Sequence, residues 1–259
     1  MNTITICINT FRESVRDRIF YVLLVFALVV IACSKAIAWI AMEEGTIPEK
    51  VMQDLGLAAI AFFSVIIAIY VGTGLLYKET DKRTIYTILS KPVHTYEFIL
   101  GKYFGLMLTL FINVAVMGAV FLGYLYGWVR VANWGLVEAI LLIYTEVVVV
   151  TALAIFFSTM ASPILSAVFT FCMCVLGHFV WTFSLLATLA RQGRSRAGEW
   201  VCTIVQFLLP NLYFFDVKME AVHGLPIAAA DVAWTMVYGA TYAAVLLIAS
   251  VAIFSRKNF

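Results

Sequence analysis

The sequence predicts an all-α integral membrane protein with six transmembrane helices. Of its 259 residues, 64% are hydrophobic and only 12% are charged, and the mean hydropathy is +1.01. A soluble domain has roughly half apolar and about a quarter charged residues, so this chain has too little polar sequence to cover a soluble surface. The formal net charge of +2 does not favour nucleic acid as a partner. We therefore expect residues 1–259 to form a single domain embedded in the lipid bilayer.

Residues 1–18 have a helical periodicity of their own. One face is apolar: Ile4, Ile8, Phe11 and Val15. The rest is polar and largely charged: Asn9, Arg12, Glu13, Arg16, Asp17 and Arg18. This pattern predicts an interfacial elbow helix that lies along the membrane with its apolar stripe in lipid. The alternative is the charged start of a signal peptide, because Ala36-Ile37-Ala38 resembles a cleavage site, but the apolar run that follows is long enough to span.

Six apolar stretches are long enough to cross a hydrocarbon core of about 30 Å, which takes roughly 20 helical residues. They are Ile19–Ala41, Leu55–Tyr77, Tyr103–Tyr126, Trp134–Phe157, Ile164–Leu189 and Val232–Phe254. A seventh apolar run, Trp200–Leu209, is too short to span. We expect it to form a re-entrant or interfacial helix on the outer side, before the last span.

The lysine and arginine distribution predicts the orientation. With the N-terminus inside, the cytosolic segments contain ten basic residues: Arg12, Arg16, Arg18, Lys78, Lys82, Arg83, Lys91, Lys102, Arg256 and Lys257. The short outer loops contain only Lys50 and Arg130. Positive loops stay inside, so we expect both termini to be cytosolic. We also expect the protein to lie in the cytoplasmic (inner) membrane. Residues 190–231 are then a long extracytoplasmic loop.

The segment 77–102 mixes charge, helix formers and a proline in an otherwise apolar chain. Thr80 or Asp81 can cap a short cytosolic helix, and Pro92 ends it. Ile85, Ile88 and Leu89 form an apolar patch flanked by charged side chains. Such a patch is suited to a groove of a partner protein. The candidate docking residues are Glu79, Lys82, Arg83, Thr84, Ile85, Ile88, Leu89 and Pro92. The alternative is that this helix only lies on the membrane.

Ionisable residues at membrane depth are candidates for function. Glu146 lies near the middle of the fourth span, and Glu138 lies two turns nearer the outside on the same face as Thr145. These residues form a polar stripe toward a translocation path, or else hydrogen-bonded groups that hold the packing. Both interpretations stay open for Glu146, whereas the packing role is favoured for Glu138. His178 is the one histidine at membrane depth, so a bis-histidine haem would lack its second ligand.

Sequence signatures of an enzyme are absent. There is no G-x-S-x-G and no H-E-x-x-H, and the G-x-x-x-x-G-K spacing fails at Tyr96. The five cysteines give no disulfide framework. We expect no ATPase site, no metal and no cofactor on this chain, so its energy must come from another subunit or from an ion gradient.

Four places along the chain carry a resemblance to a known family. They are FRESVRDR at 11–18; KE at 78–79 with TI at 84–85, LSKPV at 89–93 and GK at 101–102; LPN at 209–211 with Phe215; and FSRKNF at 254–259. In these places the chain resembles the type-2 ABC transporter permeases, in particular the NosY-like group. One departure is that Thr95 and Tyr96 stand where the family often has a basic residue.

This resemblance implies a half-transporter, an exporter whose substrate the sequence does not indicate. Two permease copies would form a homodimer around a path and bind two separate ABC ATPase subunits, which carry ATP and Mg²⁺. The segment 77–102 would be the coupling element, and residues 158–166 would form a smaller second contact. The loop 190–231 would cap the path or meet an extracytoplasmic protein.

Two other functions stay open. One is a conformational transmitter that acts on an extracytoplasmic partner without bulk transport. The other is a membrane anchor of a redox or assembly complex that uses Glu146 and His178 to bind a cofactor or partner.

Overall fold

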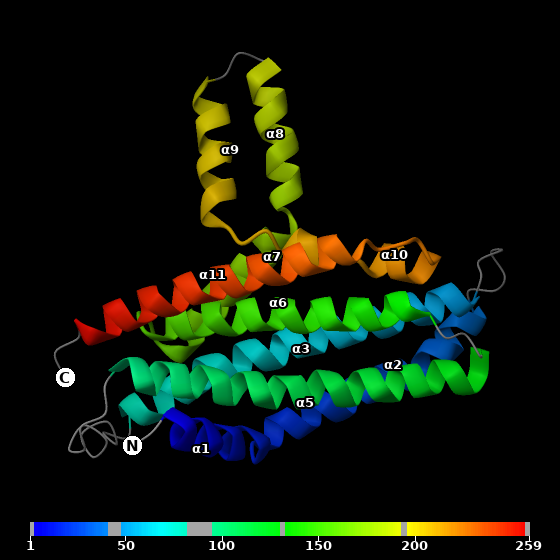
Figure 1. Ribbon diagram of the computed structural model, residues 1–259, viewed down its shortest axis with the longest axis horizontal. Coiled ribbons are helices and arrows are strands. Elements are labelled where there is room, and N and C mark those ends of the chain that lie inside the picture. Colours follow the sequence, from blue (N-terminus) through cyan, green and yellow to red (C-terminus); the bar gives the residue numbers. More distant parts are fainter. Residues whose placement is uncertain (1–2, 41–47, 82–94, 130–132, 193–195, 257–259) are drawn as a thin grey trace.

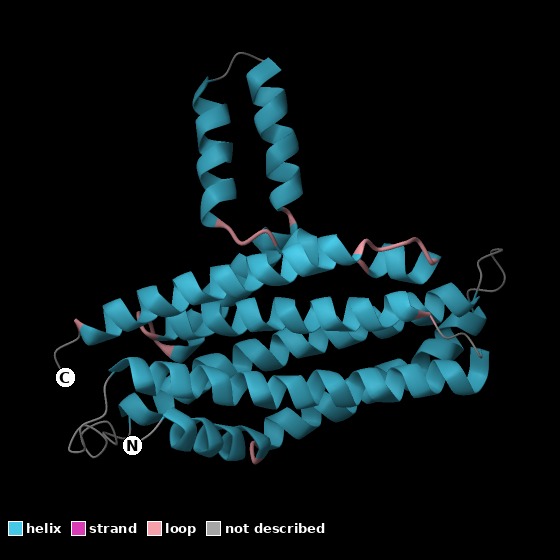
Figure 2. Cartoon of the chain, in the orientation of Figure 1, coloured by secondary structure: helices cyan, strands magenta, loops and turns pink. Residues whose placement is uncertain are grey.

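The computed structural model describes residues 3–40, 48–81, 95–129, 133–192 and 196–256, and within these ranges all regular secondary structure is helical (Figure 2). The helices are α1 (Thr3–Val15), α2 (Arg18–Ile40), α3 (Pro48–Asp81), α5 (Thr95–Val129), α6 (Trp134–Ser158), α7 (Pro163–His178), α8 (Val180–Gln192), α9 (Arg196–Leu208), the 3-10 turn η2 (Leu212–Phe215), α10 (Lys218–His223) and α11 (Ala229–Ser255). The predicted all-α class is confirmed.

The long helices α2, α3, α5, α6 and α11 run along one axis and form a bundle (Figure 1). Helices α8 and α9 pair as a hairpin that points away from this bundle (Figure 1). Helix α1 begins and helix α11 ends at the same end of the bundle, where α3 also ends and α5 begins (Figure 1). The predicted topology requires this arrangement, because an even number of spans returns the chain to the side where it started.

Four helical stretches are long and apolar enough to cross a membrane by themselves: Glu49–Gly74, Thr95–Gly127, Trp134–Ser158 and Ala229–Ser255. Two bent helix pairs pass the same test when each pair is taken together: α1 with the first part of α2, and α7 with α8. The described residues therefore provide four to six spans. The six predicted spans agree with the upper number if each bent pair is one span.

The predicted span Ile164–Leu189 is not one continuous helix in the structure. The chain bends by 59° between α7 and α8. The last turn of α7 lies against the chain that returns from α9, and a Cβ at Gly177 would be only 2.8 Å from the Pro210 carbonyl oxygen. This packing requires glycine, the weakest helix former after proline, at the position where the helix ends. Helix α8 then pairs with α9, which contains most of the predicted short run Trp200–Leu209.

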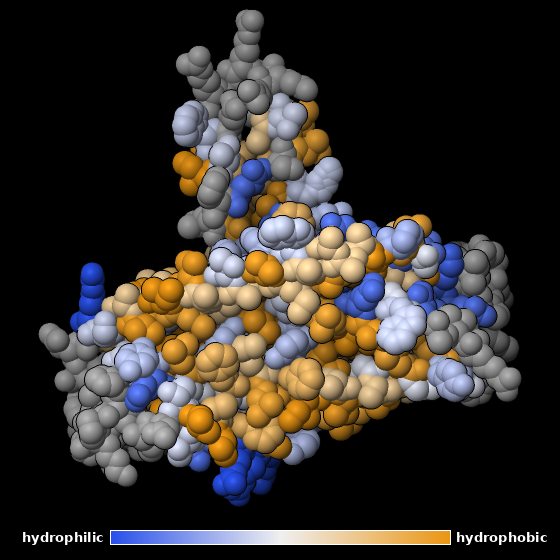
Figure 3. Space-filling model, viewed as in Figure 1, coloured by the Kyte–Doolittle hydropathy of each residue, from blue (hydrophilic) through white to orange (hydrophobic). Residues whose placement is uncertain are grey.

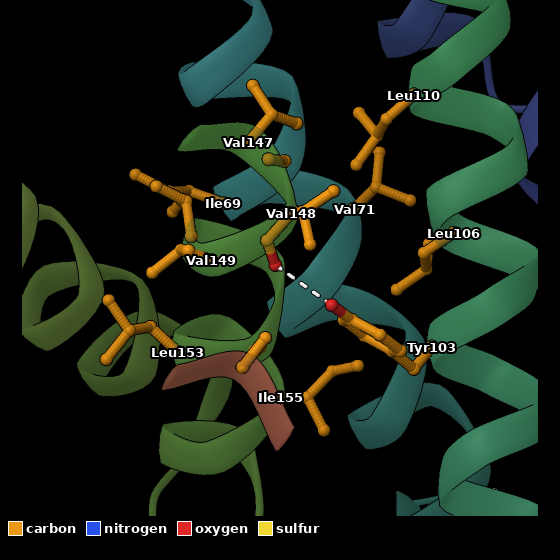
Figure 4. Packing of buried hydrophobic residues seen from close by; sticks show 14 of the residues in the cluster. Ile69, Val71, Tyr103, Leu106, Leu110, Val147, Val148, Val149, Leu153 and Ile155 are labelled. Carbon is orange, nitrogen blue, oxygen red and sulfur yellow. Dashed lines mark hydrogen bonds between the residues drawn. The ribbon is translucent and has the colours of Figure 1, made fainter. Parts of the chain in front are cut away.

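Helix α6 is the central helix of the bundle. From Leu142 to Ile155, only Tyr144 is less than fully buried, because α3, α5, α7 and α11 surround this helix. A helix that is apolar on all sides is expected in such a position. Two tyrosines link it to α5: the Tyr103 hydroxyl donates to the Val148 carbonyl at 3.3 Å (Figure 4), and the Tyr144 hydroxyl donates to the Met107 carbonyl at 3.4 Å.

Helix α1 packs tightly on the start of α5. A Cβ at Gly101 would lie 2.8 Å from the Ile6 Cβ, and one at Gly105 would lie 2.6 Å from the Cys7 carbonyl oxygen and 2.7 Å from the Thr10 Cβ. The G-x-x-x-G spacing of Gly101 and Gly105 therefore makes a close helix contact, and this contact joins two helices of the same chain. At Gly123 and Gly127, the other glycine pair of α5, nothing lies within 4 Å of an added Cβ.

The outer face of α1 agrees with the predicted elbow helix. The side chains of Ile4 and Ile8 are exposed on the side away from the buried Ile6 and Thr10. Helix α1 meets α2 at an angle of 61°. A bent entry of this kind lets α1 lie along a membrane surface while α2 crosses it. The contact of α1 with lipid stays a prediction.

The contact at Gly105 predicts that an added methyl group changes the thermal stability differently at two glycines of α5. Gly105→Ala should lower the thermal midpoint of the purified protein, because overpacking costs about 1–3 kcal/mol, and should make Cys7 react faster with a maleimide. Gly123→Ala adds the same methyl group in open space. It should leave both readings unchanged or raise the midpoint, because alanine favours helix over glycine by about 1 kcal/mol. Equal effects of the two substitutions would mean that α1 is not held by this contact.

Candidate functional site

A buried carboxyl group lies in the middle of the bundle. Glu146 is on the central helix α6, and its side chain is 4% exposed. A carboxylate at this depth is costly unless another polar group faces it. The described structure provides that group: the Glu146 Oε1 atom lies 3.4 Å from Nε2 of His178, the last residue of α7.

The second nitrogen of the imidazole limits how protons are arranged in this pair. His178 Nδ1 lies 3.0 Å from the Cys174 carbonyl oxygen, which can only accept a hydrogen bond, so we assign the hydrogen to Nδ1. A neutral ring then has no hydrogen on Nε2. The contact with Glu146 therefore holds one further proton, either on the imidazole or on the carboxyl group. Both arrangements leave the pair with no net charge, which makes its burial tolerable.

The pair lies next to the bend between α7 and α8. His178 is followed directly by Phe179, whose N–H donates to the Leu176 carbonyl rather than to a residue four positions back. Gly177 contacts the returning segment at Pro210 and Leu212. The imidazole is 34% exposed, whereas the carboxyl group is enclosed. Rearrangement of α7 at this bend would therefore expose or cover the Glu146 carboxyl group.

The returning chain adds a second pair of charges. Asp216 and Lys218 form an ion pair with 3.3 Å between Oδ1 and Nζ, and both act electrostatically on Glu146. Sequence analysis missed this pair, because the residues belong to a polar stretch beyond the LPN motif. Their place beside Glu146 depends on the return of the chain toward α6.

The structure separates the remaining residues of the predicted polar stripe from this site. Thr145 is buried, and its hydroxyl donates to the Leu141 carbonyl in the same helix at 3.0 Å. Its methyl group would be 2.9 Å from a Cβ at Gly239, so it holds α6 close to α11. Glu138 is partly exposed and lies eight residues before Glu146, about 12 Å along the helix axis. Of the predicted depth residues, the structure brings together Glu146 and His178.

The predicted elbow residues lie on α1, in the turn that follows it and at the start of α2. Phe11 is partly buried, and the side chains of Arg12, Arg16 and Arg18 are exposed. Exposed arginines beside the exposed Ile4 and Ile8 form the amphipathic surface that an interfacial helix needs. Their contact with the membrane stays a prediction.

The predicted coupling residues lie almost entirely outside the described part of the chain. Glu79 is in the last turn of α3, without a described side chain. Lys82, Arg83, Thr84, Ile85, Ile88, Leu89 and Pro92 lie outside the described residues. The described flanks, α3 and α5, meet the same end of the bundle as both chain ends (Figure 1).

The predicted second contact, residues 158–166, is described. The Ser158 hydroxyl donates to the Thr73 carbonyl of α3 at 3.3 Å, and the Ser166 hydroxyl donates to the Phe157 carbonyl at 3.0 Å. Between these two anchors the side chains of Met160 and Ile164 are exposed, by 56% and 81%. The loop is therefore anchored by hydrogen bonds on both sides and presents two large apolar side chains outward.

No group of three or more His, Cys, Asp or Glu side chains in the described ranges is arranged to hold a metal ion. The chemistry that the site itself supports is the holding or relocation of one proton between Glu146 and His178.

The contact between Glu146 and His178 predicts different effects for removing the imidazole and for removing only the charge of the carboxyl group. His178→Phe should destabilise the protein, because it leaves the Glu146 carboxyl group without its partner and an unmade buried hydrogen bond costs about 1–3 kcal/mol. Glu146→Gln should still assemble, because the amide N–H can donate to Nε2 of a neutral ring. A double-mutant cycle on thermal stability should give a coupling of roughly 0.5–3 kcal/mol for this pair.

The same cycle with Glu138→Gln is the matched control, and it should give no coupling with His178. A coupling of zero for Glu146 and His178 would show that their contact contributes nothing to the fold.

Comparison with known proteins gives one family. The family model described as ABC-2 family transporter protein matches residues 4–259, which is nearly the whole chain. No curated protein matches the chain at a significant level.

Proposed function

This chain belongs to the ABC-2 family of transporter proteins, and from that premise we propose that it is an export permease that works as a homodimer with two separate ABC ATPase subunits. The family makes it an integral membrane permease subunit that works with an ABC ATPase. In our proposal ATP and Mg²⁺ bind in that ATPase, and this chain carries no cofactor of its own. Both termini lie in the cytosol, and the membrane is the inner membrane.

The observation that carries the coupling part of the proposal is the tight contact between α1 and α5. The coupling element connects α3 to α5, and α5 begins at Thr95. Within its first three turns α5 contacts α1 through Gly101 and Gly105, and Tyr103 binds the carbonyl of Val148 on α6. A displacement of the coupling element by the ATPase would therefore move α1, α5 and the central helix together.

The homodimer is supported by the unpaired face of α7. Four exposed apolar side chains follow one stripe of this helix and its end: Val168, Cys172, Val175 and Phe179. A stripe at i, i+4, i+7 and i+11 forms one continuous apolar face, which can pack against the same face of a second copy about a two-fold axis. The α8–α9 hairpin starts from the same end of α7 and contacts little of the described bundle (Figure 1). In the proposal α7 faces its symmetry mate, and the hairpin reaches over the second copy.

The Glu146–His178 pair is proposed to hold α7 in one of its two transport positions. The pair joins α6 to α7 at the bend, so breaking it would free the outer half of the fifth span. In this proposal movement of the shared proton accompanies the change in access.

A conformational transmitter without bulk transport is the second candidate. The observation in its favour is the hairpin, where Trp200, Val201 and Ile204 on α9 are exposed by 60% or more. An apolar surface of this kind would suit an extracytoplasmic protein. ATPase activity that changes with such a protein, and with no solute, would favour this function over export.

The docking role of the coupling element can be tested by co-purification. The permease is expressed with the ABC ATPase encoded beside it and purified on a tag that only the permease carries. We expect one ATPase per permease. Ile88→Asp should abolish the ATPase band while the permease stays in the membrane, because a charge would enter an apolar groove.

Ile88→Val is the matched control, since it keeps the side chain apolar, and it should retain the ATPase. Full binding and full ATPase stimulation by Ile88→Asp would refute docking through this residue.

The dimer can be tested with two native cysteines. Cys172 is exposed on α7, and Cys33 is exposed on α2. Variants that keep only one of these two cysteines are treated in membranes with a short bismaleimide. Cys172 should give a cross-linked dimer, and Cys33 should not. A dimer that forms only through Cys33 would place the two-fold axis beside α2 and contradict the proposed face.

A further inference from the structure

A groove lies on the outer surface between α5 and α11. It encloses a volume of about 500 Å³, and its lining is almost entirely apolar. Its floor is formed by the central helix at Val148 and by Tyr103, whose hydroxyl already donates to the Val148 carbonyl. The groove therefore offers no unused hydrogen-bonding group on its floor that would favour water.

The groove exists because α11 is lined there with alanine. Ala240, Ala243 and Ala244 follow each other at helical spacing and face α5, which presents larger side chains on the opposite wall. Phe104 on one rim is 51% exposed, and Ile248 on the other is 70% exposed. The groove thus opens outward from the bundle, on a surface that is predominantly apolar over these helices (Figure 3).

The position and length of the groove correspond to one leaflet of a bilayer. On α11 it runs from Ala240 to Val251, which is about 16 Å at 1.5 Å per residue. The hydrocarbon core is about 30 Å thick, so one leaflet contributes about 15 Å. On α5 the groove uses the first part of the helix, beginning at Tyr96. It therefore occupies the half of the bundle where both chain ends lie.

We propose that this groove binds one acyl chain of a membrane phospholipid, taken from the leaflet on the side of the chain termini. A helix of the same length with a diameter of about 10 Å needs roughly 1,300 Å³, more than twice the volume of the groove. The groove therefore cannot enclose a helix of a second copy or of another protein, whereas it can enclose a single extended hydrocarbon chain.

The end of the groove suits a phospholipid headgroup. Tyr96 lies at this end and is 50% exposed. Arg256, the residue after the last turn of α11, is exposed beyond Val251. Tyrosine and arginine are typical of the membrane interface, where the ring meets the headgroup region and the guanidinium group binds phosphate.

Lipid in this groove would also act on coupling. Tyr96, Leu100 and Phe104 belong to the same turns of α5 that hold α1 through Gly101 and Gly105. An occupied groove supports these turns from the side opposite α1, so that α5 transmits a displacement instead of tilting. This second step rests on the proposed function, whereas lipid binding itself does not.

The test uses the full chain without its ATPase. The protein is reconstituted in vesicles of phosphatidylethanolamine and phosphatidylglycerol that contain a phospholipid with a photoreactive group in its acyl chain, and labelled residues are found by mass spectrometry. We expect labelling concentrated on Tyr96, Phe104 and Ile248. Ala244→Phe fills the groove from an exposed position and should reduce this labelling at least fivefold.

Ala252→Phe is the matched control, because Ala252 is exposed on α11 outside the groove, and it should label like the native chain. If Ala244→Phe does not fold, Ala240→Leu fills the other end and should give the same loss. Labelling spread evenly over all exposed apolar helices, such as α2, would overturn the proposal. Cross-linking of the groove to a second protein copy instead of lipid would also overturn it.

The effect on coupling is measured separately, as ATPase stimulation in the complex. Lower stimulation by Ala244→Phe with unchanged co-purification would support the second step. Unchanged stimulation with lost lipid labelling would overturn that step and leave lipid binding standing. If the proposed partnership with an ATPase is wrong, the native chain will fail to co-purify with the ATPase. That outcome is measured separately from lipid labelling and from ATPase stimulation.

Discussion

The arrangement of this protein depends on the close approach of two helix backbones at Gly101 and Gly105. With no side chains at these positions, α1 can lie directly on the first turns of α5, and the Cys7 carbonyl oxygen takes the place that a Cβ would need. Helix–helix contacts of this kind are favourable in membranes, where they do not rely on the hydrophobic effect. Helices α1 and α5 are thereby fixed to each other at the end of the bundle where the predicted coupling element joins α5. The same turns of α5 form a wall of the outer groove, so three features of the molecule share one short stretch of helix.

The second constraint is electrostatic and acts at the centre of the bundle. In a medium of low dielectric constant a lone carboxylate would be expensive, and the imidazole of His178 provides the partner. This contact joins α6 to the end of α7, which is also where the helix stops against Pro210 and Leu212. Packing of the returning chain and pairing of the buried charge therefore favour the same bend. The close contact between α1 and α5 lies at the termini-side end of the bundle, whereas the bend after α7 interrupts a helix next to the buried pair.

The sequence predicted the class, the long apolar helices and the family, because each of these depends on composition, length or short motifs. It identified Glu146 and His178 as separate residues at membrane depth. Their meeting could have been inferred from spacing, since both lie about 12–15 residues from the loop that joins their helices, and antiparallel helices pair at equal distances from the turn. The break at Gly177 could not be inferred, because the reason for it is a segment about 33 residues later in the chain that packs against that glycine. Likewise, the two glycine pairs of α5 are alike in sequence, and only the surrounding structure distinguishes the pair that is in contact from the pair that is open.

The packing of α1 against α5 also has a consequence for the synthesis of the chain. Ile6 meets a glycine at position 101, so the N-terminal helix is synthesised about 95 residues before the surface that receives it. At about 5–20 residues per second, the nascent helix waits for roughly 5–20 s without its tertiary partner. If α1 lies at the membrane surface as predicted, its exposed isoleucines would rest in lipid during this interval and its arginines in the headgroup region. The amphipathic character of α1 would then keep the helix at the surface until its binding site is synthesised.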